Sequence, residues 1–110
     1  MRPPTPRPLP PRFEPWPDDH EPTPFQAGVL AFVSRLEPGD LATYAEVAEA
    51  IGRPGGGQAV ANVLRRAPDA PWWRVVPSDG RVYRSHRPVQ VPLLRAEGHQ
   101  VADDGHITTT

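Results

Sequence analysis

The sequence predicts a mainly helical domain of the winged-helix type, in which a helix-turn-helix unit is followed by a small β-hairpin. Apolar residues recur at helical spacing in several stretches that begin with capping residues and end at Gly or Pro. A glycine-rich turn joins two of these stretches, which is typical of a helix-turn-helix. Further along the chain, two short segments rich in Val, Trp and Tyr flank a strong turn signal, which favours a hairpin.

The first 22 residues are predicted to form a disordered, proline-rich arm. Nine of the 17 prolines lie between Pro3 and Pro22, and few apolar residues accompany them. Such a stretch cannot offset the entropy cost of ordering by burying surface, and its prolines favour polyproline conformations. Its acidic residues also argue against a targeting peptide. The folded domain is therefore expected to span residues 23–107 of the 110-residue chain.

Three helices are predicted in the first part of the domain. The first spans about residues 23–36, because a hydroxyl cap is followed directly by a proline. The second spans about residues 43–51 and begins with a capping box formed by Thr43 and Glu46. After a glycine-rich turn, the third helix covers about residues 58–66, and a proline ends it.

The second part of the domain is predicted to contain a hairpin and one more helix. The hairpin strands are residues 73–76 and 81–83, on either side of a turn at residues 77–80. The last helix spans about residues 89–97 and is ended by a glycine. Residues 101–110 are expected to add a strand near the C-terminus.

The composition excludes several classes of protein and several kinds of site. The chain has no cysteine, so it has neither a disulfide framework, nor a thiolate metal site, nor a thiol nucleophile. This composition favours a cytoplasmic location. No apolar stretch approaches the roughly 20 residues that a membrane span needs. The four histidines are scattered along the chain, so no metal site and no cofactor are expected.

The charge distribution bears on nucleic-acid binding. The net charge of −1 argues against it, but the residues between Phe25 and Gly98 include nine Arg against seven Asp or Glu, a local balance of +2. All twelve basic residues are Arg, the better residue for phosphate forks and for stacking on bases. A compositional bias of the source genome is an alternative explanation, so charge alone does not decide the question.

An ordered set of short motifs runs through the domain. These are Phe25-Gln26, Thr43–Ala48, Ile51–Gly55, Ala59-Val60, Pro71–Val76, Ser78–Gly80 and Glu97-Gly98. In this order they resemble the C-terminal domains of O6-alkylguanine-DNA alkyltransferases over roughly residues 25–98. The resemblance implies the mainly α, winged-helix-like fold of those domains, with double-stranded DNA as the partner.

The central motif departs from that of the catalytic family. The enzymes carry Pro-Cys-His-Arg-Val, in which the Cys takes the alkyl group and the His helps to deprotonate it, whereas Trp72 and Trp73 occupy these positions here. An indole neither accepts an alkyl group as a thiolate does nor acts as a general base. The sequence therefore resembles the non-catalytic, alkyltransferase-like branch and is not expected to be an enzyme. The alternative, with the resemblance set aside, is that Trp72 and Trp73 are core aromatics that begin a strand.

The resemblance also implies how DNA is bound. The third helix enters the minor groove, and the damaged guanine is rotated out of the stack. The DNA-binding residues expected on this basis are Tyr44, Gln58, Ala59, Ala61, Asn62 and Arg65. Gln58 stands where relatives carry an Arg finger, so weaker and less salt-dependent binding is expected. The alternatives are an ordinary helix position for Tyr44 and a solvated helix end for Arg65.

The flipped base is expected to enter a lesion pocket. The pocket residues implied by the resemblance are Pro71, Trp72, Arg74, Val75, Tyr83, Arg84 and Ser85. Arg84, with Arg87 as its substitute, is expected over the purine face, where a guanidinium stabilises by cation–π contact. An exposed basic loop is the alternative. Glu97 is expected to pair with Arg74, since a partly buried Arg needs such a partner.

Two functions from different classes follow from these observations. The first is a monomeric, non-enzymatic sensor that binds O6-alkylguanine in DNA by nucleotide flipping and directs the lesion to nucleotide excision repair proteins. The second is a small winged-helix transcription regulator that recognises intact duplex sequence through the major groove. An enzyme that uses a residue other than Cys is a third hypothesis. Equal affinity for guanine and O6-methylguanine would exclude the first function.

Overall fold

The structure, a computed structural model, describes residues 10, 13, 16 and 21–108 of the chain. Its elements follow in the order α1 (Pro24–Ser34), β1 (Ala42–Thr43), α2 (Tyr44–Ala50), α3 (Gly57–Leu64), the 3-10 turn η1 (Trp72–Arg74), β2 (Val75–Val76) and α4 (Arg87–Ala96). Helices dominate among these elements, which confirms the predicted mainly helical class. Most of the arm predicted over residues 1–22 lies outside the described residues.

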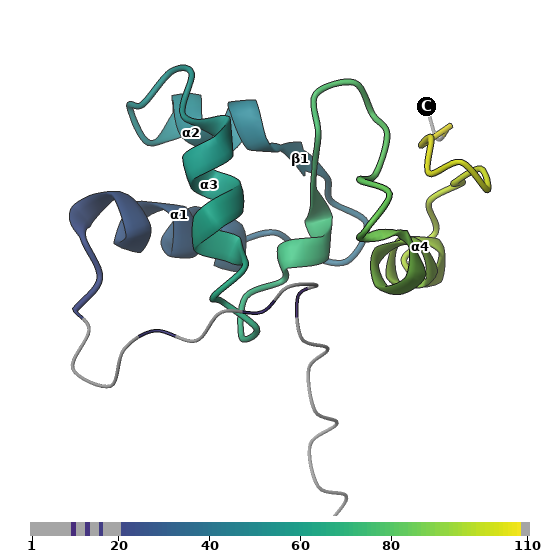
Figure 1. Cartoon of the computed structure of the whole chain (residues 1–110), viewed down its shortest axis with the longest axis horizontal. Coiled ribbons are helices and arrows are strands. Elements are labelled where there is room, and N and C mark those ends of the chain that lie inside the picture. The colour runs from purple at the N-terminus through teal and green to yellow at the C-terminus, as the bar shows by residue number, and fades with distance from the viewer. Residues whose placement is uncertain (1–9, 11–12, 14–15, 17–20, 109–110) are drawn as a thin grey trace, which may run out of the picture.

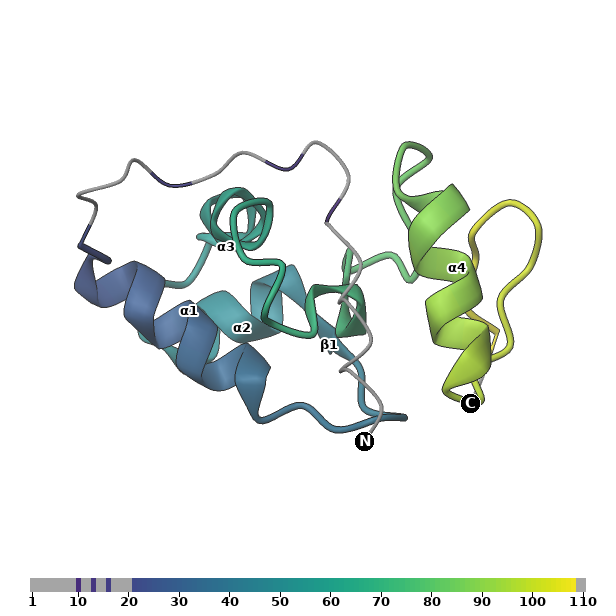
Figure 2. The same ribbon diagram turned by 90° about the horizontal axis from the view of Figure 1, so that it is seen from below.

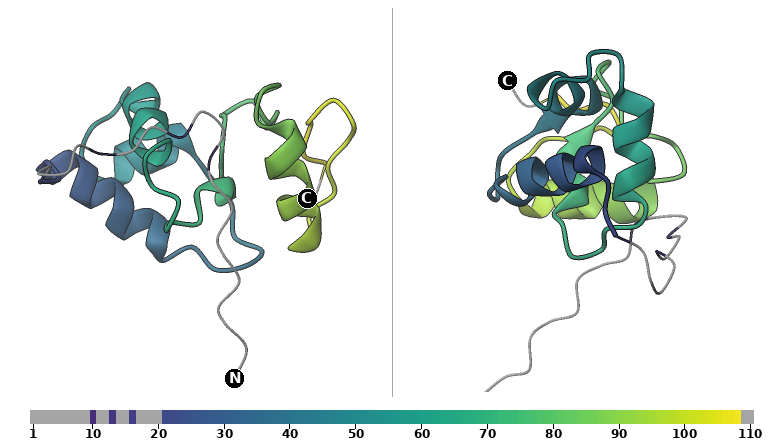
Figure 3. Two further views of the ribbon diagram at one scale, coloured as in Figure 1. Left: turned by 60° about the horizontal axis from the view of Figure 1, so that its bottom comes forward. Right: turned by 90° about the vertical axis from the view of Figure 1, so that its left-hand side faces the viewer.

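The helices form two groups that the short strands connect. α1, α2 and α3 pack against one another on one side of the molecule, whereas α4 lies on the other side with the C-terminal segment (Figures 1 and 2). The left-hand view of Figure 3 shows β1 and η1 between the two groups. The sheet therefore connects the helix-turn-helix unit to α4.

Both predicted N-terminal caps are present. At α1, Thr23 Oγ1 accepts from Gln26 N at 3.1 Å, and Gln26 Oε1 accepts from Thr23 N at 2.9 Å. At α2, Thr43 Oγ1 accepts from Glu46 N at 3.0 Å, so the cap forms, but the complete capping box predicted there is found at α1 instead. These local bonds fix where both helices start.

The predicted helix-turn-helix is formed by α2 and α3. The turn between them passes through Gly55, whose φ of +81° strains any residue with a Cβ atom. At Gly56, an added Cβ would lie 2.9 Å from the carbonyl oxygen of Arg53, so a side chain does not fit there. The glycine-rich stretch therefore allows the tight approach of α3 to α2.

The predicted hairpin is wrong. β2 pairs with β1 in parallel, with Ala42 opposite Val75 and Thr43 opposite Val76. The turn itself forms, since Gly80 N donates to Pro77 O at 3.0 Å. However, Arg81 bridges to His106 and not to β2, and Val101 bridges to Ile107. Both residues of β2 are buried, which is typical of a strand that is covered on both faces. A strand of an exposed hairpin would instead leave every second side chain in solvent.

The last helix starts earlier than predicted. α4 begins at Arg87 and not at residue 89, and Pro88 lies in its first turn, where helix amides have no internal partner. Pro92 lies inside the helix, which nevertheless continues to Ala96. Gly98, with a φ of +94°, follows directly after the C-cap, as predicted.

One hydrophobic core extends from α1 to α4. The large side chains that are fully buried belong to Val29, Val33, Val47, Val60, Val75, Val82, Gln90 and Leu94. Valines from α1, α2, α3 and β2 thus meet in the same core, which holds the helix-turn-helix against the sheet. Among residues 21–108, no helix combines the length and apolar character that a membrane crossing requires.

Candidate functional site

A hollow of about 740 Å³ lies between α3 and the loop that leads from β2 to α4. Its lining consists of Gln58, Ala61 and Arg65 from α3, and of Tyr83, Arg84, Ser85 and His86 from the loop. We call it the α3–loop hollow. Six of these seven residues are among the predicted DNA-binding and pocket residues, so the fold brings the two predicted groups together.

Tyr83 forms an aromatic wall of this hollow. Its ring stacks on that of Tyr44, with centroids 5.8 Å apart and an interplanar angle of 16°. Tyr83 is 42% exposed, whereas Tyr44 beneath it is only 7% exposed. Burial raises the pKa of Tyr44 far above its ordinary value, and the nearby Tyr83 raises it further. The Tyr44 phenol therefore stays neutral and supports the exposed Tyr83 ring from behind.

The solvent-facing side of α3 carries a row of linked polar side chains. Gln58 Nε2 donates to Asn62 Oδ1 at 3.3 Å, and Arg65 Nη2 donates to the same oxygen. The predicted Gln58, Asn62 and Arg65 thus lie side by side along one helix face. Ala59 and Asn62 face a second hollow, beside α1, and Arg65 lines both hollows.

Trp72 lies behind the wall of the hollow and does not line it. Its side chain is 3% exposed. The ring meets Trp73 edge-on at 5.9 Å and His86 edge-on at 6.4 Å, and His86 in turn meets Tyr83 edge-on at 5.4 Å. Five rings, from Tyr44 through Tyr83, His86 and Trp72 to Trp73, therefore form one continuous chain of aromatic contacts.

Four residues predicted for the lesion pocket do not line the α3–loop hollow. Pro71 and Arg74 border a different hollow, near Leu36 and Asp69. Val75 is fully buried in β2, and Trp72 is enclosed by its aromatic neighbours. Burial in the core and in the chain of rings keeps Trp72 and Val75 away from this hollow, and Pro71 and Arg74 face another one, so their place in a lesion pocket stays a prediction.

The predicted pair of Arg74 and Glu97 is confirmed. Arg74 Nε and Nη2 donate to the carboxylate of Glu97 at 2.9 and 2.8 Å, and Arg74 Nη1 donates to Leu36 O at 2.7 Å. Trp73 Nε1 also donates to Glu97, at 2.8 Å. Burial alone would raise the pKa of Glu97, but the hydrogen bonds from Arg74 and Trp73 outweigh it and lower this pKa. One carboxylate thus fixes two of the three side chains of η1, those of Trp73 and Arg74.

Sequence reasoning missed Gln90 and His86. Gln90 is 1% exposed, and its Nε2 donates to Trp73 O at 2.9 Å and to Val75 O at 3.0 Å, so it ties α4 to η1 and β2. The sequence signal that could have identified Gln90 is its place as a polar residue between the apolar positions of α4. His86 follows Tyr83, Arg84 and Ser85 directly, and its place in the same loop was the signal that it belongs to the hollow.

The lining of the α3–loop hollow defines what it can bind. Two guanidinium groups, one imidazole and one phenol surround it, together with the amide of Gln58. These groups donate hydrogen bonds and stack on flat, electron-rich rings. Among the described residues, no Asp or Glu lines this hollow. In the same part of the chain, no three His, Asp or Glu side chains gather as a metal-binding group.

The sequence profile of the family described as "6-O-methylguanine DNA methyltransferase, DNA binding domain" matches residues 24–99. The chain belongs to this family. The resemblance inferred from the ordered motifs is thereby confirmed. The match covers α1 to α4 and both segments that line the α3–loop hollow, so the hollow is part of the family's domain.

One relative and one solved structure are similar to this chain over most of its length. A protein of Vibrio parahaemolyticus named "DNA base-flipping protein" is 32% identical over 88 residues, which cover 76% of this chain and 88% of the relative. The crystal structure of S. pombe Atl1 in complex with damaged DNA containing O6-carboxymethylguanine has the same fold, with a TM-score of 0.67 and 23% identity. That match covers 78% of this chain and 88% of Atl1.

A methyltransferase structure matches over the same domain. Mycobacterium tuberculosis OGT in complex with DNA gives a TM-score of 0.63 and 28% identity, over 70% of this chain and 50% of OGT. The chain therefore spans about half the length of OGT. A catalytic cysteine cannot be part of this chain, because the chain contains none.

Proposed function

We propose that this protein binds O6-alkylguanine in double-stranded DNA, holds the flipped base in the α3–loop hollow and leaves the alkyl group in place. The observation that carries the proposal is the hollow itself, where an exposed aromatic ring and two guanidiniums gather beside α3. The names of the Vibrio relative and of the S. pombe complex, which refer to base flipping and to a damaged guanine, support it.

Retention of the alkyl group follows from the chemistry of the chain. Direct transfer needs a soft nucleophile close to the O6 substituent, and the chain contains no cysteine. Trp72 stands at the acceptor position, but an indole is a poor nucleophile and this one is buried behind His86. The imidazole of His86 has no thiol to deprotonate. The protein therefore acts by binding and not by catalysis.

The hollow suggests a pose for the flipped base. The guanine stacks on the exposed face of Tyr83, whose other face is supported by Tyr44. A base–aromatic stack of this kind contributes about 1–3 kcal/mol. The guanidinium of Arg84 covers the base from the other side and favours its electron-rich face. Contact of Tyr44 with a DNA phosphate, which the sequence suggested, would require the Tyr83 ring to move.

α3 supplies the groove contacts in this proposal. The helix enters the minor groove, and Gln58 fills the space that the flipped nucleotide leaves in the stack. Flipping costs a few kcal/mol, and less when alkylation has weakened the base pair. A preference for damaged over intact guanine therefore arises even before the hollow contacts the adduct.

Removal of the lesion must then come from another system. Because the adduct stays on the base, we propose that the bound protein, as a cytoplasmic monomer, marks the site for nucleotide excision repair proteins. In that role the lifetime of the complex matters more than any chemical step, because the repair proteins must find the marked site before the base returns to the stack.

The test compares two labelled duplexes that differ only in guanine or O6-methylguanine at one position. Fluorescence anisotropy should give a clearly tighter Kd for the damaged duplex, and the intact mass of the protein should not change after incubation. Equal affinity would point to the transcription-regulator alternative and refute the sensor. A mass increase of one methyl group would refute the non-enzymatic mechanism.

A further inference from the structure

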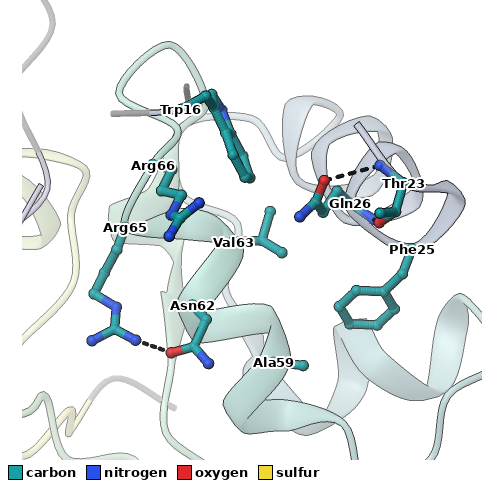
Figure 4. Close-up of a pocket in the computed structure, with 9 residues that line it drawn as sticks. All are labelled: Trp16, Thr23, Phe25, Gln26, Ala59, Asn62, Val63, Arg65 and Arg66. Atoms are coloured by element: carbon teal, nitrogen blue, oxygen red, sulfur yellow. Dashed lines mark hydrogen bonds between the residues drawn. The ribbon is translucent and has the colours of Figure 1, made fainter. Parts of the chain in front are cut away.

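The two walls of the α3–loop hollow are built differently. One wall is the helix α3, whose polar side chains are linked to each other, as Figure 4 shows for Arg65 and Asn62. The other wall comes from residues 77–86, which lie between β2 and α4 and belong to no helix or strand. We call them the β2–α4 loop. Because such a segment has no regular hydrogen bonds of its own, its order depends on the contacts that hold its backbone.

The C-terminal segment, residues 101–108, holds the backbone of this loop. Val82 N donates to Gly105 O at 2.8 Å. Two residues further along the segment, Ile107 N donates to Gly80 O at 2.8 Å. Figures 1 and 2 show the loop between α3 and the C-terminal segment. The segment therefore supports the loop from the side that faces away from the helix wall.

Gly105 is the tightest point of this contact. Its φ is +87°, and an added Cβ would lie 2.6 Å from Arg87 Nε and 3.0 Å from Val82 O, so no side chain fits there. Arg87 Nε in turn donates to Val82 O at 3.4 Å. Val82 is fully buried, so the polar groups of its backbone depend on these two neighbours. Arg87, which the sequence suggested as a substitute for Arg84, lies against Gly105 and does not line the hollow.

The residues that follow this contact are the ones that form the loop wall. Tyr83, Arg84 and Ser85 come directly after Val82, and all three line the α3–loop hollow. Beyond them, Tyr83 O accepts from His86 N at 2.8 Å, in the turn that leads into α4. The three residues thus lie between two fixed points, and a shift of Val82 moves all of them.

We propose that the C-terminal segment positions the loop wall for the flipped base, with Gly105 as the positioning residue. This inference rests on the proposed function. The segment lies beyond the family match, which ends at residue 99. A wall that is ordered before binding lowers the entropy cost of holding the base. An intact duplex with all its bases stacked does not use the wall. Disturbing the segment should therefore weaken binding to the lesion and leave binding to intact DNA unchanged.

The first experiment measures Kd by anisotropy for the guanine and O6-methylguanine duplexes, well below the Tm of each variant. Gly105→Ala should raise the Kd for the damaged duplex by about two- to tenfold, as when one side chain must be ordered on binding. The Kd for the intact duplex should stay at the wild-type value. The matched control is Gly39→Ala, because Gly39 also has a positive φ, of +95°, but an added Cβ there would approach only Glu97 O, at 3.9 Å. This control should lower the Tm and keep the wild-type ratio of the two Kd values.

Limited proteolysis reports the order of the loop without DNA. Trypsin cuts after arginine in backbone that opens, and Arg84 is exposed in the middle of the loop wall. Gly105→Ala should speed the cut after Arg84 relative to the cut after Arg65, at the end of α3, and Gly39→Ala should leave this ratio unchanged. Mass spectrometry of the first fragments identifies each cut.

A milder variant covers the case in which Gly105→Ala does not fold. Ile107→Pro removes the amide that donates to Gly80 O and leaves Gly105 in place. It should change the Kd ratio and the cleavage after Arg84 in the same direction, by smaller factors.

Two results would overturn the inference. One is cleavage after Arg84 at the wild-type rate in the folded variants. The other is a Kd that is unchanged, or raised equally for both duplexes, since an equal rise means only a loss of folded protein. A wild-type chain without preference for O6-methylguanine would instead refute the proposed function, and the cleavage rates would still show whether the C-terminal segment orders the loop.

Discussion

Glu97→Gln should destabilise the domain strongly, although the two side chains have nearly the same shape. Glu97 accepts hydrogen bonds from Arg74, from Trp73 and from the backbone of Gly39. The side chains of Arg74 and Glu97 are only 11% and 12% exposed. Gln removes the negative charge and leaves the guanidinium of Arg74 without its counter-ion in a largely buried position.

The expected loss is about 3 kcal/mol of unfolding free energy, as for other buried ion pairs that lose one partner. In a domain of this size, that loss corresponds to a fall in Tm of roughly 10–20 °C. The matched control is Asp104→Asn, which breaks the pair of Arg81 and Asp104, whose side chains are 51% and 56% exposed. Such an exposed pair contributes little to stability, so this variant should melt close to the wild type.

The pH dependence provides a second readout. The pKa of Glu97 is lowered in the folded chain from its ordinary value of 4.5, so the unfolded chain binds this proton more readily. The stabilising effect of the carboxylate is complete above that ordinary value and is lost as the pH falls through the lower, folded-state value. The stability difference between wild type and Glu97→Gln should therefore be complete above the ordinary pKa of 4.5 and shrink as the pH falls below it. Equal melting of the Glu97→Gln and Asp104→Asn variants would refute this account of η1.

Three further predictions concern DNA binding by the proposed site, and anisotropy measurements check each of them. Tyr83→Ala should raise the Kd for the O6-methylguanine duplex by about five- to a hundredfold, which is the change expected when one base–aromatic stack is lost. Tyr83→Phe should bind with nearly the wild-type Kd, because it keeps the ring. Equal losses in both variants would argue against stacking. Gln58→Arg should lower the Kd and make it depend more steeply on salt, because it adds a positive charge at the position proposed to fill the gap in the base stack. An unchanged Kd at moderate salt would count against this placement of Gln58. A duplex with O6-carboxymethylguanine should bind more tightly than a duplex with the neutral O6-carbamoylmethyl group, which has a similar shape. The negative charge should be favoured because Arg65 and Arg84 line the hollow, and because no carboxylate of the described residues lines it. Arg84→Gln should reduce that difference, and an undiminished difference would show that Arg84 does not face the adduct.

The start of each early helix was predictable because its signals are local. The caps at Thr23 and Thr43 act over three residues, so their geometry follows from the nearby sequence. The partner of β2 was not predictable in this way. β1 has only two residues and lies more than thirty positions earlier in the chain, so neither alternation nor a turn signal links the two strands.

The lining of the α3–loop hollow was predictable only in part, because only some of its signals are local. The order of the motifs identified the α3 residues and the loop from Tyr83 to Ser85, and the fold brings these together. Burial of Trp72 depends on where α4 and His86 pack, which no local pattern around Trp72 encodes. Gln90 shows the same limit, because its role depends on two carbonyl groups, of Trp73 and Val75, from a distant part of the chain.

The burial of Trp72 changes how replacement of the acceptor cysteine should be understood. An indole at this position does more than remove a nucleophile, because its edge contact with His86 extends the row of rings that ends in the Tyr83–Tyr44 stack. A cysteine side chain is too small to reach along this path, and it would leave a space behind His86. A rigid wall lowers the entropy cost of holding a flipped base. In the proposed function, the indole that removes transfer chemistry therefore also favours longer retention of the flipped base, and binding without repair needs both properties.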